Sequence, residues 1–153
     1  MRLYLAQHGE ALDKAQDPER PLSPAGRADV ERLAAHLAGR GLRVGAVLHS
    51  GKTRARQSAE ITAAAIAPGV APAAVDPIAP NDPPQIFIEA TVAHLETDTW
   101  VAGHLPFQAR CVALLIGLPA DPPPVLYTPG SVVCLEGEGH RWAIAWMLRP
   151  ELV

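Results

Sequence analysis

The sequence lacks an excess of charge, a long hydrophobic run and a leader-like start. Its 13 basic and 16 acidic residues give a formal net charge of −3, which argues against a broad surface for nucleic acid. Four apolar residues follow Met1-Arg2, fewer than the roughly 7–15 of a signal-peptide core. The uncharged stretch 61–75 contains two prolines and is shorter than the ~18 residues of a membrane span. We therefore expect a cytoplasmic protein without a membrane segment.

Cysteine is also scarce, since only Cys111 and Cys134 are present and no C-x-x-C spacing occurs. This excludes the common zinc and redox motifs, and we interpret both residues as buried thiols. At 153 residues, 48% hydrophobic and 19% charged, the chain can bury one core. We expect a single domain over residues 1–153 and, with no long exposed apolar stripe, a monomer.

Proline is abundant and divides the chain. Eleven of the 16 prolines fall in residues 68–84 and 119–129, which predicts two ordered loops. Apolar runs predict strands at Arg2–Ala6, Ala46–Leu48 and Trp100–Ala102.

Helical periodicity occurs between the strands. Ser23 and Pro24 are typical of a helix N-terminus, and Gly39 and Gly41 predict its end. Further helices are expected over residues 52–67, from near Leu105 onward and, as a short piece, within 82–95. In the third helix, we expect the apolar side chains to be buried: Phe107, Cys111, Leu114, Leu115 and Leu118.

The C-terminal part has the pattern of a β-hairpin, Ser131–Glu136 and Arg141–Leu148, around Gly137-Glu138-Gly139. Trp142, Ile144, Trp146 and Leu148 alternate and are expected on one face. Strands alternating with helices predict a three-layer α/β/α fold with an open, mainly parallel sheet and an antiparallel C-terminal hairpin.

Candidate functional residues follow three predicted strands. His8 ends the first, the cluster with Lys52, Arg54 and Arg56 follows the second, and His104 follows the third. Open α/β sheets bind ligands at the carboxyl ends of their strands, so these groups should meet at one edge.

A metal site with Glu10 or Asp82 as third ligand is disfavoured, because the cations would repel a metal ion. An anion fits better. Guanidinium groups favour phosphate, and a Leu105 amide at a helix start would point into the crevice. No metal or other cofactor is expected.

Four segments, spread over essentially the whole chain, resemble motifs of the histidine phosphatase superfamily, in particular the SixA-type phosphohistidine phosphatases. Residues 3–11 resemble its strand ending in Arg-His-Gly. Residues 17–26 resemble Arg-Pro-Leu-Thr-x-x-Gly, and 49–59 resemble Ser-x-x-x-Arg-Ala-x-Gln-Thr. Gly103-His104-Leu105-Pro106 is similar to the loop of its second histidine.

This resemblance implies the phosphoglycerate mutase-like fold and a covalent mechanism. His8 would attack phosphorus, and water would hydrolyse the resulting phosphohistidine to release inorganic phosphate. His104 and Arg54 would stabilise the phosphoryl oxygens. Arg20 would either contact phosphate as well or brace the Pro21-Leu22 turn.

One residue departs from the motif: Gln7 stands where the family has arginine. A neutral amide in the phosphate site should weaken it by about 1–2 kcal/mol. Lys52 is the better candidate to compensate, and Arg56 the poorer.

Three functions stay open at this point. The leading prediction is a phosphohistidine phosphatase that acts on a phosphorylated protein in signal transduction. The others are a small-molecule phosphomonoesterase, which needs a general acid such as Asp82 or Glu10, and a non-catalytic module that binds phosphate or a phosphoprotein.

Overall fold

The computed structural model describes all 153 residues, and strands and helices alternate along most of the chain. None of its helices combines the length and apolar character that crossing a membrane requires. The elements in chain order are β1 (Arg2–Gln7), α1 (Pro24–Gly39), β2 (Ala46–His49), α2 (Thr53–Ile66), β3 (Ala73–Ala74), α3 (Pro84–Ala90), the 3₁₀ turn η1 (Val92–His94), β4 (Thr99–Gly103), α4 (Phe107–Leu115), β5 (Val132–Glu138), β6 (Arg141–Leu148) and the 3₁₀ turn η2 (Pro150–Leu152).

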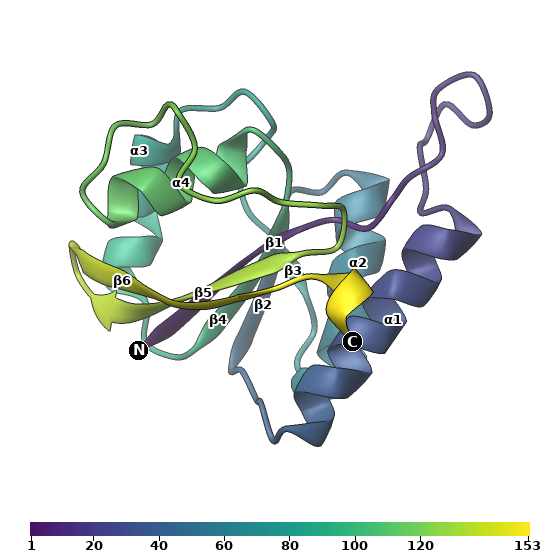
Figure 1. Cartoon of the computed structure of the whole chain (residues 1–153), viewed down its shortest axis with the longest axis horizontal. Coiled ribbons are helices and arrows are strands. Elements are labelled where there is room, and N and C mark those ends of the chain that lie inside the picture. The colour runs from purple at the N-terminus through teal and green to yellow at the C-terminus, as the bar shows by residue number, and fades with distance from the viewer.

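The strands form one six-stranded sheet in the order β3-β2-β4-β1-β5-β6. Neighbours from β3 to β1 are parallel, whereas β5 is antiparallel to both β1 and β6. Helices α1 and α2 cover one face, and α3 and α4 cover the other (Figure 1). This confirms the predicted three-layer α/β/α fold with a mainly parallel sheet and an antiparallel C-terminal hairpin.

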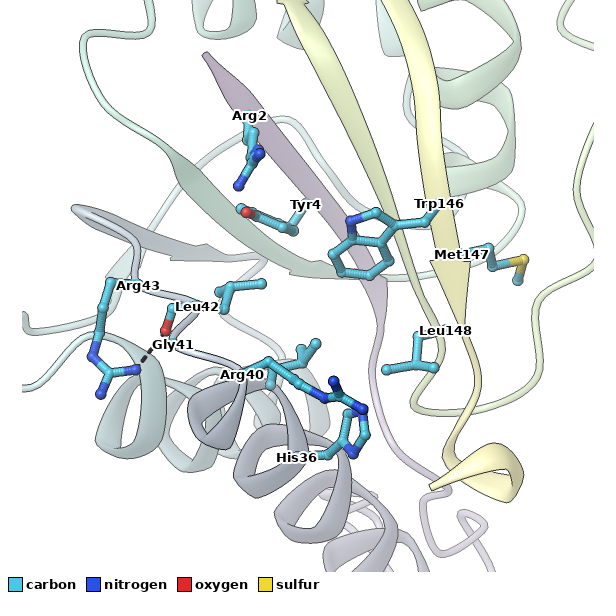
Figure 2. Close-up of a pocket in the computed structure, with 11 residues that line it drawn as sticks. Arg2, Tyr4, His36, Arg40, Gly41, Leu42, Arg43, Trp146, Met147 and Leu148 are labelled. Atoms are coloured by element: carbon cyan, nitrogen blue, oxygen red, sulfur yellow. Dashed lines mark hydrogen bonds between the residues drawn. The ribbon is translucent and has the colours of Figure 1, made fainter.

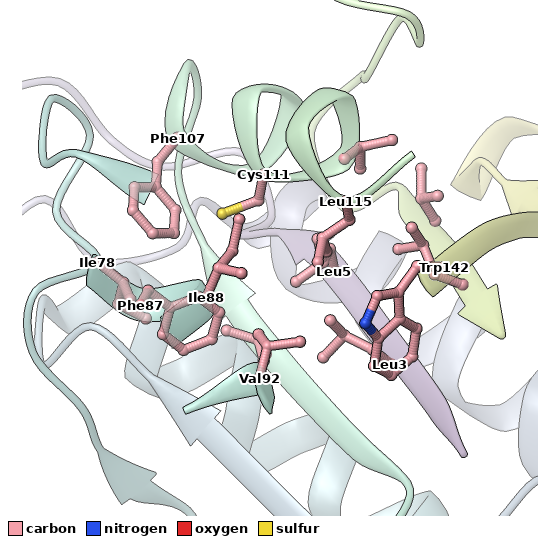
Figure 3. Close-up of a cluster of buried hydrophobic side chains, with 14 residues drawn as sticks. Leu3, Leu5, Ile78, Phe87, Ile88, Val92, Phe107, Cys111, Leu115 and Trp142 are labelled. Atoms are coloured by element: carbon pink, nitrogen blue, oxygen red, sulfur yellow. The ribbon is translucent and has the colours of Figure 1, made fainter. Parts of the chain in front are cut away.

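Strand β1 is buried from Leu3 to Ala6 because the sheet is covered on both faces. Leu3 and Leu5 join a cluster under α3 and α4, drawn in Figure 3. Tyr4 and Ala6 point the other way, into a second cluster that α1 and α2 cover. The two cysteines are buried and free, as expected, one in each cluster.

Helices α1 and α2 follow their sequence signals closely. The Ser23 hydroxyl accepts a hydrogen bond from the Gly26 amide at 3.0 Å and caps α1, as Ser23-Pro24 predicted. The buried face of α2 consists of small and aliphatic residues at helical spacing: Ala55, Ser58, Ala59, Thr62, Ala63 and Ile66. Small side chains bring the first turn of α2 close to the sheet edge.

The hairpin forms as predicted, but its side chains do not share one face. A bulge between Cys134 and Leu135 pairs Cys134 with Trp146 and Leu135 with Ile144, which skips one residue of β6. A one-residue shift in the pairing places the side chains that follow it on the opposite face of the sheet. Trp142 therefore joins the cluster beneath α4, while Trp146 packs against the cluster on the opposite face.

The third predicted helix starts later than its pattern suggested. The helix α4 begins at Phe107, with Pro106 as its N-cap, so Leu105 precedes the helix. It ends at Leu115, and Leu118 beyond it is 47% exposed. The expected burial of Leu118 was therefore wrong, since the helical face ends before reaching it.

Candidate active site

A cavity of about 420 Å³ opens beyond the carboxyl ends of β1 and β4. Groups from the ends of both strands, the first turn of α2, the loop 10–20 and two further loops at Pro80 and Pro129 enclose it. Its lining residues are Gln7, His8, Glu10, Ala11, Arg20, Arg54, Pro80, His104, Leu105 and Pro129. The structure thus brings together His8, Arg54 and His104, which lie up to 96 residues apart in sequence.

The His8 ring is held from both sides. Its Nδ1 lies 2.6 Å from the Gly9 carbonyl oxygen, which can only accept, so Nδ1 carries the proton. Its Nε2 then keeps a lone pair and accepts a hydrogen bond from Arg54 Nε at 3.2 Å. The geometry therefore selects the tautomer in which Nε2 is free to act as a nucleophile.

Burial, followed by the charges of Arg54 and Arg20, lowers the pKa of His8 to about 4, although the Gly9 hydrogen bond acts in the opposite direction. At neutral pH the ring is uncharged. An uncharged imidazole is the form that can attack an electrophile.

His104 faces His8, with 5.1 Å between the ring centroids. It is 1% exposed, its Nε2 lies 2.6 Å from the Ser50 hydroxyl, and its buried Nδ1 has no partner. Burial, aided by the neighbouring cations, lowers the pKa of His104 to about 3. The neutral His104 ring therefore lines the cavity beside the His8 ring.

Two glycines allow these loops to approach their neighbours. A Cβ on Gly103 would lie 2.6 Å from Gln108 Nε2, the amide that donates to the Ala6 and Val101 carbonyls. A Cβ on Gly9 would lie 2.8 Å from the Gly26 carbonyl. A larger residue at either position would clash with these neighbours.

Two guanidinium groups line the cavity without an acidic partner. Neither Arg20 nor Arg54 belongs to any of the chain's ion pairs. Burial, followed by the charge of Arg20, lowers the pKa of Arg54. Arg20 has a left-handed backbone, φ 48°, and its Nε donates to the Leu12 carbonyl at 3.1 Å. Two cations held close without a counter-ion favour an anion between them.

The remaining predicted phosphate ligands fall into two groups. Gln7 lines the cavity, and its buried Oε1 accepts no hydrogen bond. Leu105 also lines it, but its amide precedes α4 and is not the helix-terminal donor that we predicted. Lys52 lies in a neighbouring cavity, and Arg56 is exposed and lines neither.

The two carboxylates considered as general acids are both engaged elsewhere. Glu10 lines the cavity, but its Oε1 accepts from the Ser23 hydroxyl at 2.8 Å. Asp82 accepts from the Ala79 amide at 2.7 Å and is not among the lining residues. No group of three His, Cys, Asp or Glu side chains has an arrangement that could hold a metal ion.

Sequence reasoning gave no role to several residues that hold the site. Ser50 contacts His104, and the Ser58 hydroxyl accepts from the Gly9 amide at 3.0 Å. Gln57 accepts from the Leu22 amide at 2.8 Å. Ser50, Gln57 and Ser58 all lie in the segment 49–59, so its motif was the available signal.

A larger cavity lies elsewhere in the molecule. It measures about 550 Å³ at the amino end of β1, between β6 and the C-terminal end of α1 (Figure 2). Leu37, Leu42 and Trp146 contribute apolar surface, with arginines around them. It lacks the facing imidazoles, so the smaller cavity is the candidate active site.

Comparisons with known proteins agree with this geometry. A family model described as histidine phosphatase superfamily (branch 1) matches residues 3–77. A solved structure of the protein histidine phosphatase SixA complexed with tungstate is 23% identical and covers 99% of both chains, with a TM-score of 0.87.

Two further proteins are similar. A candidate phosphohistidine phosphatase SixA from Agrobacterium tumefaciens is 25% identical over 97% of both chains, with a TM-score of 0.81. An uncharacterized protein of Picosynechococcus sp. is 43% identical over 68 residues, which is 42% of this chain and 41% of the relative. The chain thus matches about two fifths of that relative's length.

Proposed function

Because the chain belongs to the histidine phosphatase superfamily, we propose that it removes the phosphoryl group from a phosphohistidine on another protein, through a covalent intermediate on His8. The observation that carries the proposal is the fixed His8 tautomer. Its Nδ1–H is directed to the Gly9 carbonyl and its Nε2 lone pair lies in a cavity with two unpaired guanidiniums.

In the first step, the His8 Nε2 lone pair forms a bond to phosphorus while the bond to the leaving nitrogen breaks. The leaving imidazole keeps that electron pair and takes up a proton from solvent water. The His8 ring gains positive charge as the bond forms, and the Gly9 carbonyl, 2.6 Å from Nδ1, stabilises it.

Arg54 has two successive partners in this scheme. Without substrate its Nε donates to the nucleophilic Nε2 at 3.2 Å, which would block attack. A charged phosphoryl oxygen is a stronger acceptor than a neutral imidazole. Substrate therefore draws Arg54 onto the phosphoryl group and releases the lone pair at the same moment.

Arg20 and His104 complete the transition-state contacts. Arg20 shares charge on the phosphoryl oxygens with Arg54, and the neutral His104 ring donates one hydrogen bond from the opposite side. Ser50 orients that ring. Water then attacks the phosphohistidine, the P–N bond breaks, and inorganic phosphate leaves with neutral His8 restored.

The lack of a free carboxylate that could act as general acid favours a phosphohistidine substrate over a phosphate ester. An alkoxide needs a proton to depart, whereas imidazole is a better leaving group. Asp82 lies outside the cavity lining and Glu10 is bonded to Ser23. A reaction that requires little acid assistance therefore suits this site best.

A second candidate function has one observation in its favour. Glu10 does line the cavity, and its second carboxylate oxygen could protonate the alcohol of a small phosphomonoester. The binding module draws its support from Gln7 alone.

The test is to trap the intermediate. We expect labelled phosphohistidine protein or an aryl phosphate to transfer acid-labile, base-stable label to the chain, and His8→Ala to abolish it. His140→Ala is the matched control, because His140 is exposed on the hairpin turn, and it should label like the wild type.

Turnover then separates the functions. Faster hydrolysis of phosphohistidine protein than of sugar phosphates supports the proposal, and the reverse supports the phosphomonoesterase. If the chain binds phosphate saturably but is neither labelled nor active in turnover, the non-catalytic binding module is the function that remains.

A further inference from the structure

The chain contains only two lysines, Lys14 and Lys52, and both line the same cavity. This cavity, which we call the lysine annex, measures about 390 Å³ and adjoins the candidate active site. The two cavities share Arg20, Arg54 and Pro80 as lining residues. The remaining residues of the annex are Pro18, Glu19, Gly51 and Thr53.

The chemistry of the annex excludes an apolar ligand. None of its nine lining residues is hydrophobic, in contrast to the cavity at the amino end of β1. Four of the nine are cationic and one, Glu19, is acidic. Glu19 Oε2 accepts from the Thr53 hydroxyl at 3.4 Å and forms no ion pair with either lysine.

The lysine annex is positively charged, whereas the whole chain carries a net negative charge. The protein has a net charge of −3, yet the ammonium groups of Lys14 and Lys52 are exposed and unpaired. They come from two loops, one before α1 and one at the start of α2. Charge complementarity therefore calls for a ligand with negative groups beside the phosphoryl group.

We propose, building on the phosphohistidine phosphatase function above, that the lysine annex binds the carboxylate side chains that flank the phosphorylated histidine of the substrate protein. The phosphoryl group occupies the space between His8 and His104. A neighbouring Asp or Glu of the same substrate segment reaches the ammonium groups of Lys14 and Lys52.

These contacts act on binding rather than on chemistry. Exposed ion pairs are weak and are screened within about 8 Å at physiological salt. Each lysine should therefore change KM by about three- to fivefold and leave kcat unaltered, and the effect should vanish at high salt.

The scarcity of lysine permits a direct binding test. Three peptides carry a stable phosphonate analogue of phosphohistidine, flanked by Glu, Gln or Lys. An amine-reactive reagent and mass mapping then report the labelling of Lys14 and Lys52. The Met1 amine, at the opposite end of β1, is the internal reference.

We expect the Glu-flanked peptide to protect both lysines at least threefold more than the Gln-flanked peptide, and the Lys-flanked peptide not at all. Met1 labelling should stay constant. Equal protection by the Glu and Gln peptides would overturn the proposal. This readout needs no turnover, so it tests whether the lysine annex binds carboxylates even if the protein hydrolyses none of the peptides.

Kinetics give the second test. Lys14→Gln should raise KM for a Glu-flanked phosphohistidine peptide about three- to fivefold and for a Gln-flanked one less than twofold. Arg40→Gln and Arg141→Gln remove equal charge from exposed sites outside the annex and should change neither value. If hydrolysis does not depend on the flanking residues, the proposed binding of carboxylates in the lysine annex is refuted but the proposed function is not. If the Glu-flanked peptide protects the lysines but is not hydrolysed, the proposed function is refuted but the annex is not.

Discussion

The two ends of β1 carry cavities of opposite character. Four residue steps of extended chain, roughly 13 Å, lead from Tyr4 at one cavity to His8 at the other. The cavity at the amino end is the larger, about 550 Å³ against about 420 Å³, and Tyr4 and Trp146 pack on its wall with ring centroids 5.9 Å apart (Figure 2). The carboxyl end instead gathers imidazoles and guanidiniums.

The difference shows that volume does not locate the chemistry here. The amino-end cavity forms where the C-terminal part of α1 and the edge strand β6 leave a gap over apolar side chains. The carboxyl-end cavity forms where strands lead into loops and helices, which brings polar groups from distant segments together. This distinction predicts that substitutions at the carboxyl end alter catalysis and that substitutions at the amino end alter stability only.

Apart from loss of the nucleophile His8, the largest effect is expected at Arg54. Arg54→Gln should lower kcat/KM about 100- to 1000-fold, the usual result of removing one donor to a charged transition state. Arg56→Gln, an identical change at an exposed position two residues away, should stay within about twofold. Steady-state kinetics on an aryl phosphate measure both, and similar losses in the two variants would contradict the assigned role.

A gain is expected at Gln7. Gln7→Arg should tighten inhibition by orthophosphate about ten- to thirtyfold, because a guanidinium binds phosphate more strongly than an amide. The substitution breaks no hydrogen bond of the buried Oε1, since that atom has none. An unchanged or weaker inhibition constant would show that position 7 does not contact phosphate.

Acidification should lower the free energy of unfolding because of two histidines of the candidate active site, His8 and His104. The pKa of His8 is lowered to about 4 and that of His104 to about 3, against ~6.5 in the unfolded chain. Between pH 6.5 and 4 the unfolded state binds more protons, so the free energy of unfolding falls as pH falls and is constant for these groups above pH 7.

Urea unfolding of the wild type and of His104→Gln at pH 7.5 and 4.5 measures this contribution. The variant should lose less stability on acidification than the wild type. Equal losses would mean that His104 titrates normally in the folded protein.

The smallest catalytic effect is expected at the amino end. Trp146→Ala should reduce stability by about 1–3 kcal/mol, since a half-buried aromatic leaves a gap against Tyr4, but kcat/KM should stay within about twofold. Thermal unfolding and steady-state kinetics measure the two quantities. A tenfold loss of activity would show that the two ends are coupled.

Local patterns predicted the local structure well. The spacing of small residues indicated the buried face of α2, and Ser23-Pro24 indicated the start of α1, because capping and helical periodicity depend on neighbours within one or two turns. The hairpin pattern was also sufficient to predict β5 and β6.

Errors arose where a distant contact decides the outcome. The bulge that turns Trp142 and Trp146 to opposite faces depends on how β6 pairs with β5, and a period-2 pattern in β6 alone predicts one face. Likewise, nothing in the sequence indicates that the Glu10 carboxylate would accept a hydrogen bond from Ser23. Nor does the sequence indicate that the Ser50 hydroxyl would contact His104.

The amino-acid sequence determined the α/β alternation, the caps and which chemical groups follow each strand, because these depend on hydrophobic period and on short-range hydrogen bonding. Only the tertiary structure decided that the His8 lone pair is on Nε2, that Arg54 rests on it, and that both lysines border the same space. Those facts require the ends of β1, β2 and β4 to lie beside one another, and strand order, set by packing of the whole sheet, is what brings them there.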